Sequence, residues 1–294
     1  MFPFLKYSKI YFILSGVLVV ASAISLIVFG LNFGIDFTGG SILELEFWGE
    51  RISNEEIKEV LSDFDLGQVQ VQSSGEHGII LRMKDISEET HQEVLKRLEE
   101  KGLGELRFEA IGPVIGKELK NKTKIVALLS VLAILLYITF AFQKISKPVA
   151  SWQYGIASLI ALGHDIFIPL GVFSLLGTLY NVQITIPVIT ALLTVLGYSI
   201  NNTVVVFDRI RENLIRDRSS DFEHVVDKSL NETLTRSLNT SLTTLFVLFA
   251  ILFFGGATLK YFALALIIGL ICGTYSSLFL ASPILVSWLR RKRK

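Results

Sequence analysis

Six long apolar stretches constrain this chain of 294 residues most strongly. They cover approximately residues 10–30, 125–142, 152–176, 184–207, 238–256 and 260–288. Each is long enough to cross the hydrocarbon core of a bilayer as a helix, which takes about 20 residues. Apolar residues make up 51% of the chain, which excludes an ordinary soluble domain. The sequence therefore predicts an α-helical polytopic membrane protein with six transmembrane helices.

The third apolar stretch carries an acid near its centre. Asp165 is the only reliably charged residue between Trp152 and Leu176, and His164 precedes it. A carboxylate at the centre of a spanning helix costs about 2.5–3.5 kcal/mol on insertion scales, so such residues are rare and functional by default. Pro169 has no N–H to donate to the carbonyl of Asp165, which weakens the helix there. We expect a hinged, proton-responsive site around Asp165 and His164.

Lysine and arginine fall in alternate loops. They are Lys6 and Lys9 before the first span, Lys144 and Lys147 after the second, six basic residues in the loop 208–236, and the terminal RRKRK. The loop after the third span has no charge, and the loop after the fifth has only Lys260. Since cytoplasmic loops are enriched in basic residues, this pattern predicts that both termini are cytoplasmic.

Three regions follow from this topology. Residues 1–31 form a cytoplasmic stub and the first span, residues 32–120 an external domain with its connectors, and residues 121–294 a five-helix bundle with cytoplasmic loop 208–236 and a basic tail. The alternative for the first span is a signal peptide cleaved after Ala21-Ser22-Ala23. The apolar run continues past Ala23, and cleavage there would cut the span in half, so we expect the span to be retained.

Residues 32–120 have the composition of a globular domain. Strand patterns occur at Ser41–Trp48, Gln68–Ser73, Gly78–Met83 and Leu106–Ile111, and helix patterns begin at the caps Ser53 and Ser87. The order β-α-β-β-α-β predicts a ferredoxin-like α+β domain between the first and second spans. Neither His77 nor His91 has cysteine or carboxylate at metal-ligand spacing, so we interpret both as solvated and expect no metal.

Five motifs are spread along the chain in order. They are GIDFTGG at 34–40, IGPVIGKEL at 111–119, GHD at 163–165, GYSINNTVVVFDRIREN at 197–213 and RSLNTS at 236–241. Together they resemble the SecD/SecF family of the RND superfamily, and the fourth motif, with Tyr198 and Asn201, is specific to the SecF branch. The first motif is of a kind found in both branches and discriminates less. The resemblance covers nearly the whole chain.

This resemblance implies a half-transporter in the bacterial plasma (inner) membrane. Such a subunit pairs with SecD into a twelve-span unit beside the SecYEG translocon, with YajC as a further candidate partner. The unit is held to use an ion gradient to help preproteins emerge on the periplasmic or extracellular side. In the GHD motif, Gly163 and His164 precede Asp165, which matches the family's transmembrane acid and is our first choice for the proton carrier.

The fourth motif departs from the family at one position. Family members commonly have Asn-Asp where this chain has Asn201-Asn202, so a carboxylate is missing near the cytoplasmic end of the span. We expect Asn202 to contribute by hydrogen bonding to Asp165 or to water. For Asp208 we prefer an interfacial ion pair. For Arg209, an ion pair and a reach back toward the acid remain equal alternatives.

The glycine-rich motifs are expected to be connectors. Asp36, Gly39 and Gly40 lie where the chain enters the external domain and fit a tight backbone turn. Gly112, Pro113 and Gly116 lie where it leaves. The phosphate-loop pattern GxxxxGK[ST] is absent, so we expect no nucleotide cofactor, and work must come from an ion gradient or from another chain.

Polar residues recur on one face of each of the last three spans. They are Thr194, Tyr198, Asn201 and Asn202 in the fourth, Asn239, Thr240, Ser241, Thr243 and Thr244 in the fifth, and Gly269, Gly273 and Ser277 in the sixth. These faces are either a polar seam around Asp165 or interhelical hydrogen bonds and close packing. The amphipathic stretch 222–230 predicts an interfacial helix. The basic tail predicts contact with anionic lipids, and not with nucleic acid.

Four functions are compared. A secretion subunit couples protonation of Asp165 to motion of the external domain, and proton or sodium coupling remains open. A small-molecule or lipid exporter half has the same architecture, and a passive scaffold needs no acid. An intramembrane aspartyl protease needs two acids that share a proton, and only one deep acid is present. The sequence favours the first function and a protein that is not an enzyme.

Overall fold

The computed structural model describes residues 1–49, 52–74, 77–141, 149–217 and 221–293. By internal contacts the chain forms two compact units, one of Met1–Asn32 with Ile125–Lys294 and the other of Phe33–Lys124. Within the described ranges, six helices are long and apolar enough to cross a membrane. The prediction of six spans is therefore confirmed. Lys144 and Lys147, used to predict the topology, lie outside the described residues.

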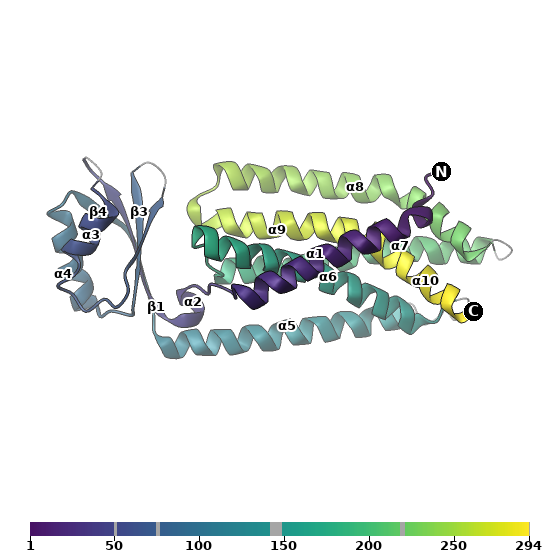
Figure 1. The fold of residues 1–294 in the computed structure, drawn as a ribbon, viewed down its shortest axis with the longest axis horizontal. Coiled ribbons are helices and arrows are strands. Elements are labelled where there is room, and N and C mark those ends of the chain that lie inside the picture. The colour runs from purple at the N-terminus through teal and green to yellow at the C-terminus, as the bar shows by residue number, and fades with distance from the viewer. Residues whose placement is uncertain (50–51, 75–76, 142–148, 218–220, 294) are drawn as a thin grey trace. The chain divides into compact units, whose positions relative to one another are not determined.

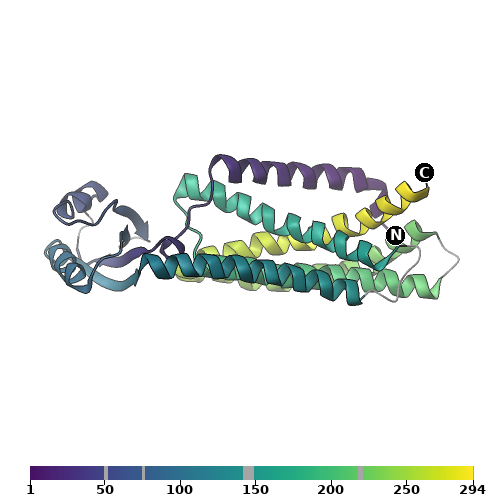
Figure 2. The same cartoon turned by 90° about the horizontal axis from the view of Figure 1, so that it is seen from below.

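The spans are long and nearly continuous helices (Figures 1 and 2). They are α1 (Ser8–Val28), α5 (Pro113–Ala141), α6 (Ser151–Tyr180), α7 (Ile186–Arg216), α8 (Phe222–Phe254) and α9 (Ala257–Ser276), which continues through a π-helical turn (Ser277–Ala281) into α10 (Ser282–Arg293). Only helices or closed barrels satisfy the backbone hydrogen bonds in lipid, which explains why each span is a continuous helix. α6 ends at Asn181 in the left-handed conformation, and α7 has Pro187 in its first turn.

The bundle has its core between α6, α7 and the α9–α10 span. Half of the apolar window of α6 and of α7 is buried, and 67% of that of the last span, whereas α5 and α1 are largely exposed. The core continues onto the first turns of α8, where Phe222, Val226 and Leu230 are buried. Small residues let the helices approach closely, since a Cβ on Gly273 would lie 3.1 Å from the Cβ of Ser199.

The stretch 208–236 differs from the predicted loop. α7 extends to Arg216 and α8 begins at Phe222, so most of the stretch is helical. The prediction of a separate interfacial helix at 222–230 is wrong, because the segment is the first part of the continuous helix α8 and its apolar face packs into the protein core. Phe4 and Leu5, from a short 3-10 turn (Phe4–Tyr7), belong to that core. An amphipathic pattern is the same whether protein or headgroups cover the apolar face.

The second unit contains a four-stranded antiparallel sheet. Its elements are β1 (Gly40–Phe47), α3 (Asn54–Val60), β2 (Gln70–Ser74), β3 (Gly78–Met83), α4 (Glu88–Glu99) and β4 (Leu103–Ile111). The strand order β2-β3-β1-β4 and the order of elements confirm the predicted ferredoxin-like topology. The two caps act as expected, since Ser53 accepts from the N–H of Glu56 and Ser87 from that of Thr90.

The sheet and the two helices enclose a separate apolar core. Leu43, Leu45, Ile79 and Leu81 alternate inward from the two central strands and are fully buried. Val94 and Leu98 from α4, with Ile57 from α3, cover them. The period-two pattern of β1 and β3 thus places one apolar face on the helices, as expected for an α+β layer.

Candidate functional site

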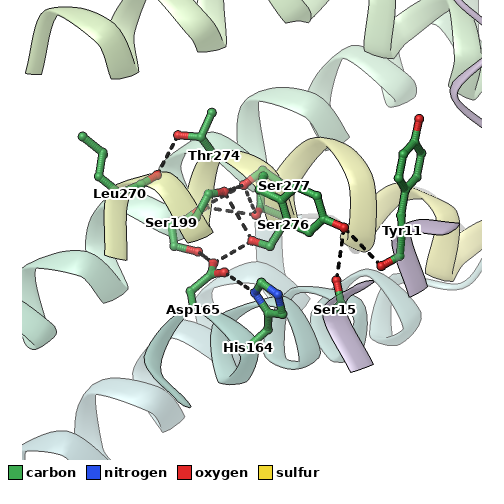
Figure 3. A network of polar contacts seen from close by, with 12 residues as sticks. Tyr11, Ser15, His164, Asp165, Ser199, Leu270, Thr274, Ser276 and Ser277 are labelled. Atoms are coloured by element: carbon green, nitrogen blue, oxygen red, sulfur yellow. Dashed lines mark hydrogen bonds and ion pairs between the residues drawn. The ribbon is translucent and has the colours of Figure 1, made fainter. Parts of the chain in front are cut away.

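Asp165 lies at the centre of a hydrogen-bonded cluster between three helices (Figure 3). It is fully buried on α6. Its Oδ2 atom accepts hydrogen bonds from Ser199 Oγ of α7 at 2.5 Å and from Ser276 Oγ of α9 at 2.6 Å. Its Oδ1 atom lies 2.8 Å from His164 Nδ1. Three donors surround the carboxyl group of Asp165, and their hydrogen bonds offset the free-energy cost of burying it.

The turn after Ser276 brings two consecutive serines inward. Ser276 contacts Asp165, and Ser277 Oγ lies 2.9 Å from Thr203 Oγ1 and donates to the carbonyl of Gly273 at 2.7 Å. Neighbouring side chains of a regular α-helix diverge by about 100°. The π-helical turn that begins at Ser277 changes this spacing, and such turns occur frequently at functional sites.

The serine hydroxyls can serve both protonation states of Asp165. When the acid is ionised, Ser276 donates to it at 2.6 Å. When the acid is protonated it must donate a hydrogen, and a hydroxyl oxygen can accept it. Ser276 then has an alternative acceptor for its own hydrogen, the carbonyl of Gly273 at 3.3 Å. The cluster therefore tolerates gain or loss of one proton through hydroxyl rotation alone.

His164 is the buried neighbour of the acid. With Asp165 ionised, Nδ1–H donates to Oδ1, because a carboxylate oxygen only accepts. The other ring nitrogen, Nε2, is buried and has no hydrogen-bond partner among the described residues. A neutral ring with its hydrogen on Nδ1 fits these surroundings, since a second N–H would lack an acceptor. The ring stacks on Tyr275, with centroids 5.9 Å apart.

The polar residues of the fourth motif lie in different surroundings. Asn202 is buried, and its Nδ2 atom has no partner in the described part of the chain. Asn201 is exposed on the other side of α7. Tyr198 donates to Ser241 Oγ at 3.3 Å, and that hydroxyl lies 2.6 Å from Thr274 Oγ1. Tyr198 thus belongs to an interhelical chain of hydroxyls that joins α7, α8 and α9.

Other polar residues of the predicted seam serve their own helices. Thr194 of α7 and Thr243 of α8 are exposed and donate to carbonyls of their own helix at 2.8 Å and 3.0 Å. Thr203 also donates within its helix but is buried beside Ser277. The structure therefore contains a buried polar seam between helices and, separately, outward-facing hydroxyls whose hydrogen bonds described above stay within their own helix.

Arg209 lies in an ion-pair network between α7 and α8. Its Nε atom is 2.7 Å from Glu232 Oε2, and its Nη1 atom is 2.6 Å from Glu212 Oε2. Asp208 is paired with Arg211 at 3.5 Å and is exposed. The hydrogen bonds of Asp165 involve neither of these residues nor Asn202 within the described part of the chain. Of the two alternatives for Arg209, the structure has the ion pair.

Pro169 lies within α6, one turn beyond Asp165, and is buried. Gly163, on the other side of the acid, has open space where a side chain would be. Beyond Pro169, α6 is bound to α1. A Cβ on Gly171 would lie 2.6 Å from Ser22 Oγ, and Ser174 Oγ donates to the carbonyl of Ser25 at 2.9 Å. This second contact region was not predicted from the sequence.

The two glycine motifs meet in the α+β unit. Asp36 is in the first turn of the short helix α2 (Ile35–Thr38), followed by Gly39 and Gly40 with φ of 76° and 136°. Side chains there would be strained. A Cβ on Gly39 would lie 2.7 Å from Pro113 Cα, and one on Gly116 would lie 2.8 Å from Gly39 N. Gly112 is less crowded, with Asp85 Oδ2 at 3.7 Å from its Cβ position.

His91 is a buried polar residue that sequence reasoning missed. It was expected to be solvated, but its ring is buried, stacks on Phe108 with centroids 3.7 Å apart, and lies between two carboxylates. Nδ1 is 3.3 Å from Glu88 Oε1 and Nε2 is 3.0 Å from Glu105 Oε2. The i to i+3 spacing from Glu88 is visible in the sequence, whereas the contact with β4 requires the fold.

Six spans that enclose a buried, hydrogen-bonded acid, joined to a ferredoxin-like unit between the first and second spans, define a multi-pass membrane transport protein. Residues 90–291 match the family described as "Protein export membrane protein SecD/SecF, C-terminal", and residues 24–47 match the "SecD/SecF GG Motif". The chain belongs to the SecD/SecF family and is of the SecF type, a transporter component and not an enzyme.

Individual relatives agree with this assignment. The chain is 39% identical to the protein translocase subunit SecF of Thermobaculum terrenum, over 98% of this chain and 94% of the relative. It is 36% identical to SecF of Synechocystis sp., over 98% and 94% respectively. The crystal structure of SecDF from Thermus thermophilus, described as translocon-associated, superposes with a TM-score of 0.86 at 34% identity. All of this chain is covered, but it spans only 39% of that longer chain.

Proposed function

We propose that this chain pairs with SecD and acts beside the SecYEG translocon, where it uses an ion gradient to promote preprotein export. Membership in the family implies association with SecD. A related SecDF chain contains a SecF-like part and is described as translocon-associated. The alternating basic loops support an orientation with cytoplasmic termini and an outer α+β unit in the plasma membrane.

The observation that carries the coupling role is the environment of Asp165. The acid is fully buried, yet Ser199, Ser276 and His164 can satisfy it in both protonation states. The hydroxyls of Ser199 and Ser276 are in direct hydrogen-bond contact with the carboxylate at 2.5 and 2.6 Å, which suits exchange of a proton at the acid. Separate proton and sodium gradients decide which ion is used.

The test is secretion in inverted vesicles that carry this chain with SecD. Asp165→Asn should fold and assemble but lose the gradient-dependent gain in preprotein translocation, because asparagine cannot exchange a proton. Asp208→Asn is the matched control, since Asp208 is exposed and its one ion pair among the described residues is with Arg211. A proton gradient and a sodium gradient are applied separately. An unchanged gain in Asp165→Asn would support a passive scaffold.

The exporter alternative has weaker support. Its architecture would be the same, but the matching family is described as a protein export membrane protein. The relatives that match over 94% of their own length are protein translocase subunits. An exporter half would confer a small-molecule resistance phenotype that depends on Asp165. Export of a preprotein without such a phenotype would separate the two functions.

A further inference from the structure

Two consecutive residues of α9 connect the buried acid to the first span. Ser276 donates to Asp165 (Figure 3), and Tyr275, the preceding residue, stacks on His164. The hydroxyl of Tyr275 donates to the carbonyl of Tyr11 at 3.1 Å and accepts from Ser15 Oγ at 3.4 Å, both on α1. The Asp165–His164 pair is therefore two side-chain contacts from α1.

α1 has few buried residues. All of its residues are described, and only Ser15 and Ser22 are buried. Ser15 contacts Tyr275, and Ser22 lies against Gly171, beyond Pro169 of α6. The two serines are two helical turns apart and lie on the same face. α1 is thus held at two points, one on the α9 residue next to the acid and the other on the far side of the proline.

Aromatic packing strengthens the first of these points. Phe279 stacks on Tyr275 with centroids 5.3 Å apart, and Tyr11 meets Phe279 edge-on at 4.8 Å. Phe4 packs on the same ring at 5.7 Å. A column of rings therefore runs from His164 through Tyr275 to the N-terminal part of the chain. Such packed contacts transmit a displacement because side chains in a dense interior have few alternative positions.

We propose that Tyr275 transmits the protonation state of the Asp165–His164 pair to α1, the span that leads into the α+β unit. This inference rests on the proposed function. Protonation removes the charge that Nδ1–H of His164 and the hydroxyl of Ser276 hold in place. Both groups can then reorient, and Tyr275 is in contact with one and adjacent in sequence to the other. Among the described residues, the titratable groups near the acid are His164 of α6 and Cys272 and Tyr275 of α9, and the phenol of Tyr11 on α1 lies near Tyr275.

Pro169 determines how α1 would move when Tyr275 is displaced. The helix lacks the hydrogen bond from residue 169 to the carbonyl of Asp165, so its two halves can bend relative to each other. α1 contacts the half beyond Pro169 through Ser22 and Ser25, the latter donating to the carbonyl of Gly171 at 3.0 Å. If Tyr275 moves while the contact of Ser22 and Ser25 with α6 stays in place, α1 is expected to tilt about that contact and to remain attached to the bundle.

The experiment uses the complete chain with SecD in proteoliposomes. Tyr275→Phe keeps the ring but removes the hydroxyl that binds Tyr11 and Ser15. Two readouts are compared, the gradient-dependent gain in preprotein translocation and the infrared band of protonated Asp165, which is identified by its loss in Asp165→Asn. We expect Tyr275→Phe to lose most of the gain and keep the band. Ser15→Ala removes only one of the two bonds of this hydroxyl and should reduce the gain in the same direction by a smaller amount. Tyr261→Phe, on the same helix, should leave both readouts unchanged.

The outcomes separate this inference from the proposed function. Full gain in Tyr275→Phe and Ser15→Ala, together with its loss in Asp165→Asn, would overturn the role of Tyr275 and leave proton coupling standing. Loss of the infrared band in Tyr275→Phe would also overturn it, because the hydroxyl would then belong to the proton-binding site. Full gain in Asp165→Asn would refute the proposed function itself. Copurification with SecD verifies that each variant is assembled.

Discussion

At the scale of single residues, each of the two units contains a buried titratable group whose charge is complemented by neighbouring side chains. Asp165 has three donors around it, and His91 has two carboxylates, Glu88 and Glu105. Hydrogen bonds from Gln92 and His91 hold the pKa of the Glu88 carboxyl below its usual range. A protonated imidazole donates from both nitrogens, so the His91 contacts are complete only when the ring carries its charge.

Replacing His91 should weaken the α+β unit. His91→Ala removes the ring stacked on Phe108 and leaves the partly buried Glu105 without this partner, at a cost of about 1–3 kcal/mol. Hydrogen–deuterium exchange in the peptides of α4 and β4 would report the loss as faster exchange. His77→Ala is the matched control, because His77 is exposed and its replacement should leave exchange unchanged. Equal behaviour of the two variants would show that the His91 contacts do not stabilise the unit.

At the scale of helices, glycine positions determine how closely α1 and α6 approach. Gly171 faces Ser22 at a separation that excludes a methyl group, and the adjacent bonds from Ser25 and Ser174 depend on this approach. Gly163, on the same helix, has nothing within 4 Å of its Cβ position. The two glycines have similar sequence surroundings but different packing.

Gly171→Ala should therefore separate α1 from α6 and destabilise the bundle. Overpacking of this kind costs about 1–3 kcal/mol. The apparent Tm of the detergent-solubilised protein, followed by its loss of helical circular dichroism, should fall in Gly171→Ala. In Gly163→Ala it should stay constant or rise, since alanine favours helix and meets no neighbour. A fall of equal size in both variants would exclude packing against Ser22 as the cause.

At the scale of the whole molecule, the chain consists of two units with separate apolar cores. The core of the α+β unit is closed by its own sheet and helices, with Leu45, Leu81 and Leu98 fully buried. The bundle core is formed by α6, α7, α8 and the last span. Long helices in the bundle need lipid around their exposed apolar faces, whereas the α+β unit has the alternating surface of a soluble domain.

The α+β unit should fold without the spans. Residues 33–124, expressed as a soluble fragment, should show a cooperative thermal transition by circular dichroism. Leu45→Ala in this fragment should lower its stability by about 2–5 kcal/mol, because it leaves a cavity under the sheet. A fragment without a cooperative transition would show that the unit depends on the spans for its stability.

Sequence reasoning was most successful where local pattern and composition carry the information. Six apolar stretches predict six spans, because a bilayer of fixed thickness requires helices of a minimum length. Alternation and capping residues predict the β-α-β-β-α-β order for the same kind of local reason. Asp165 can be recognised from the sequence because it is a charged residue within an apolar span. The five motifs then identified the family, and relatives in that family match nearly the whole chain.

The partners of the acid depend on contacts between distant segments. Ser199 and Ser276 lie 34 and 111 residues from Asp165 in sequence, and serine is too common in membrane helices to be singled out. Sequence reasoning instead considered Asn202 and Arg209, neither of which takes part in the hydrogen bonds of Asp165 within the described part of the chain. It also assigned the face of 222–230 to the membrane surface and His91 to solvent. Periodicity indicates which side of an element is apolar or polar, but the neighbour that covers that side is chosen by the packing of the whole chain.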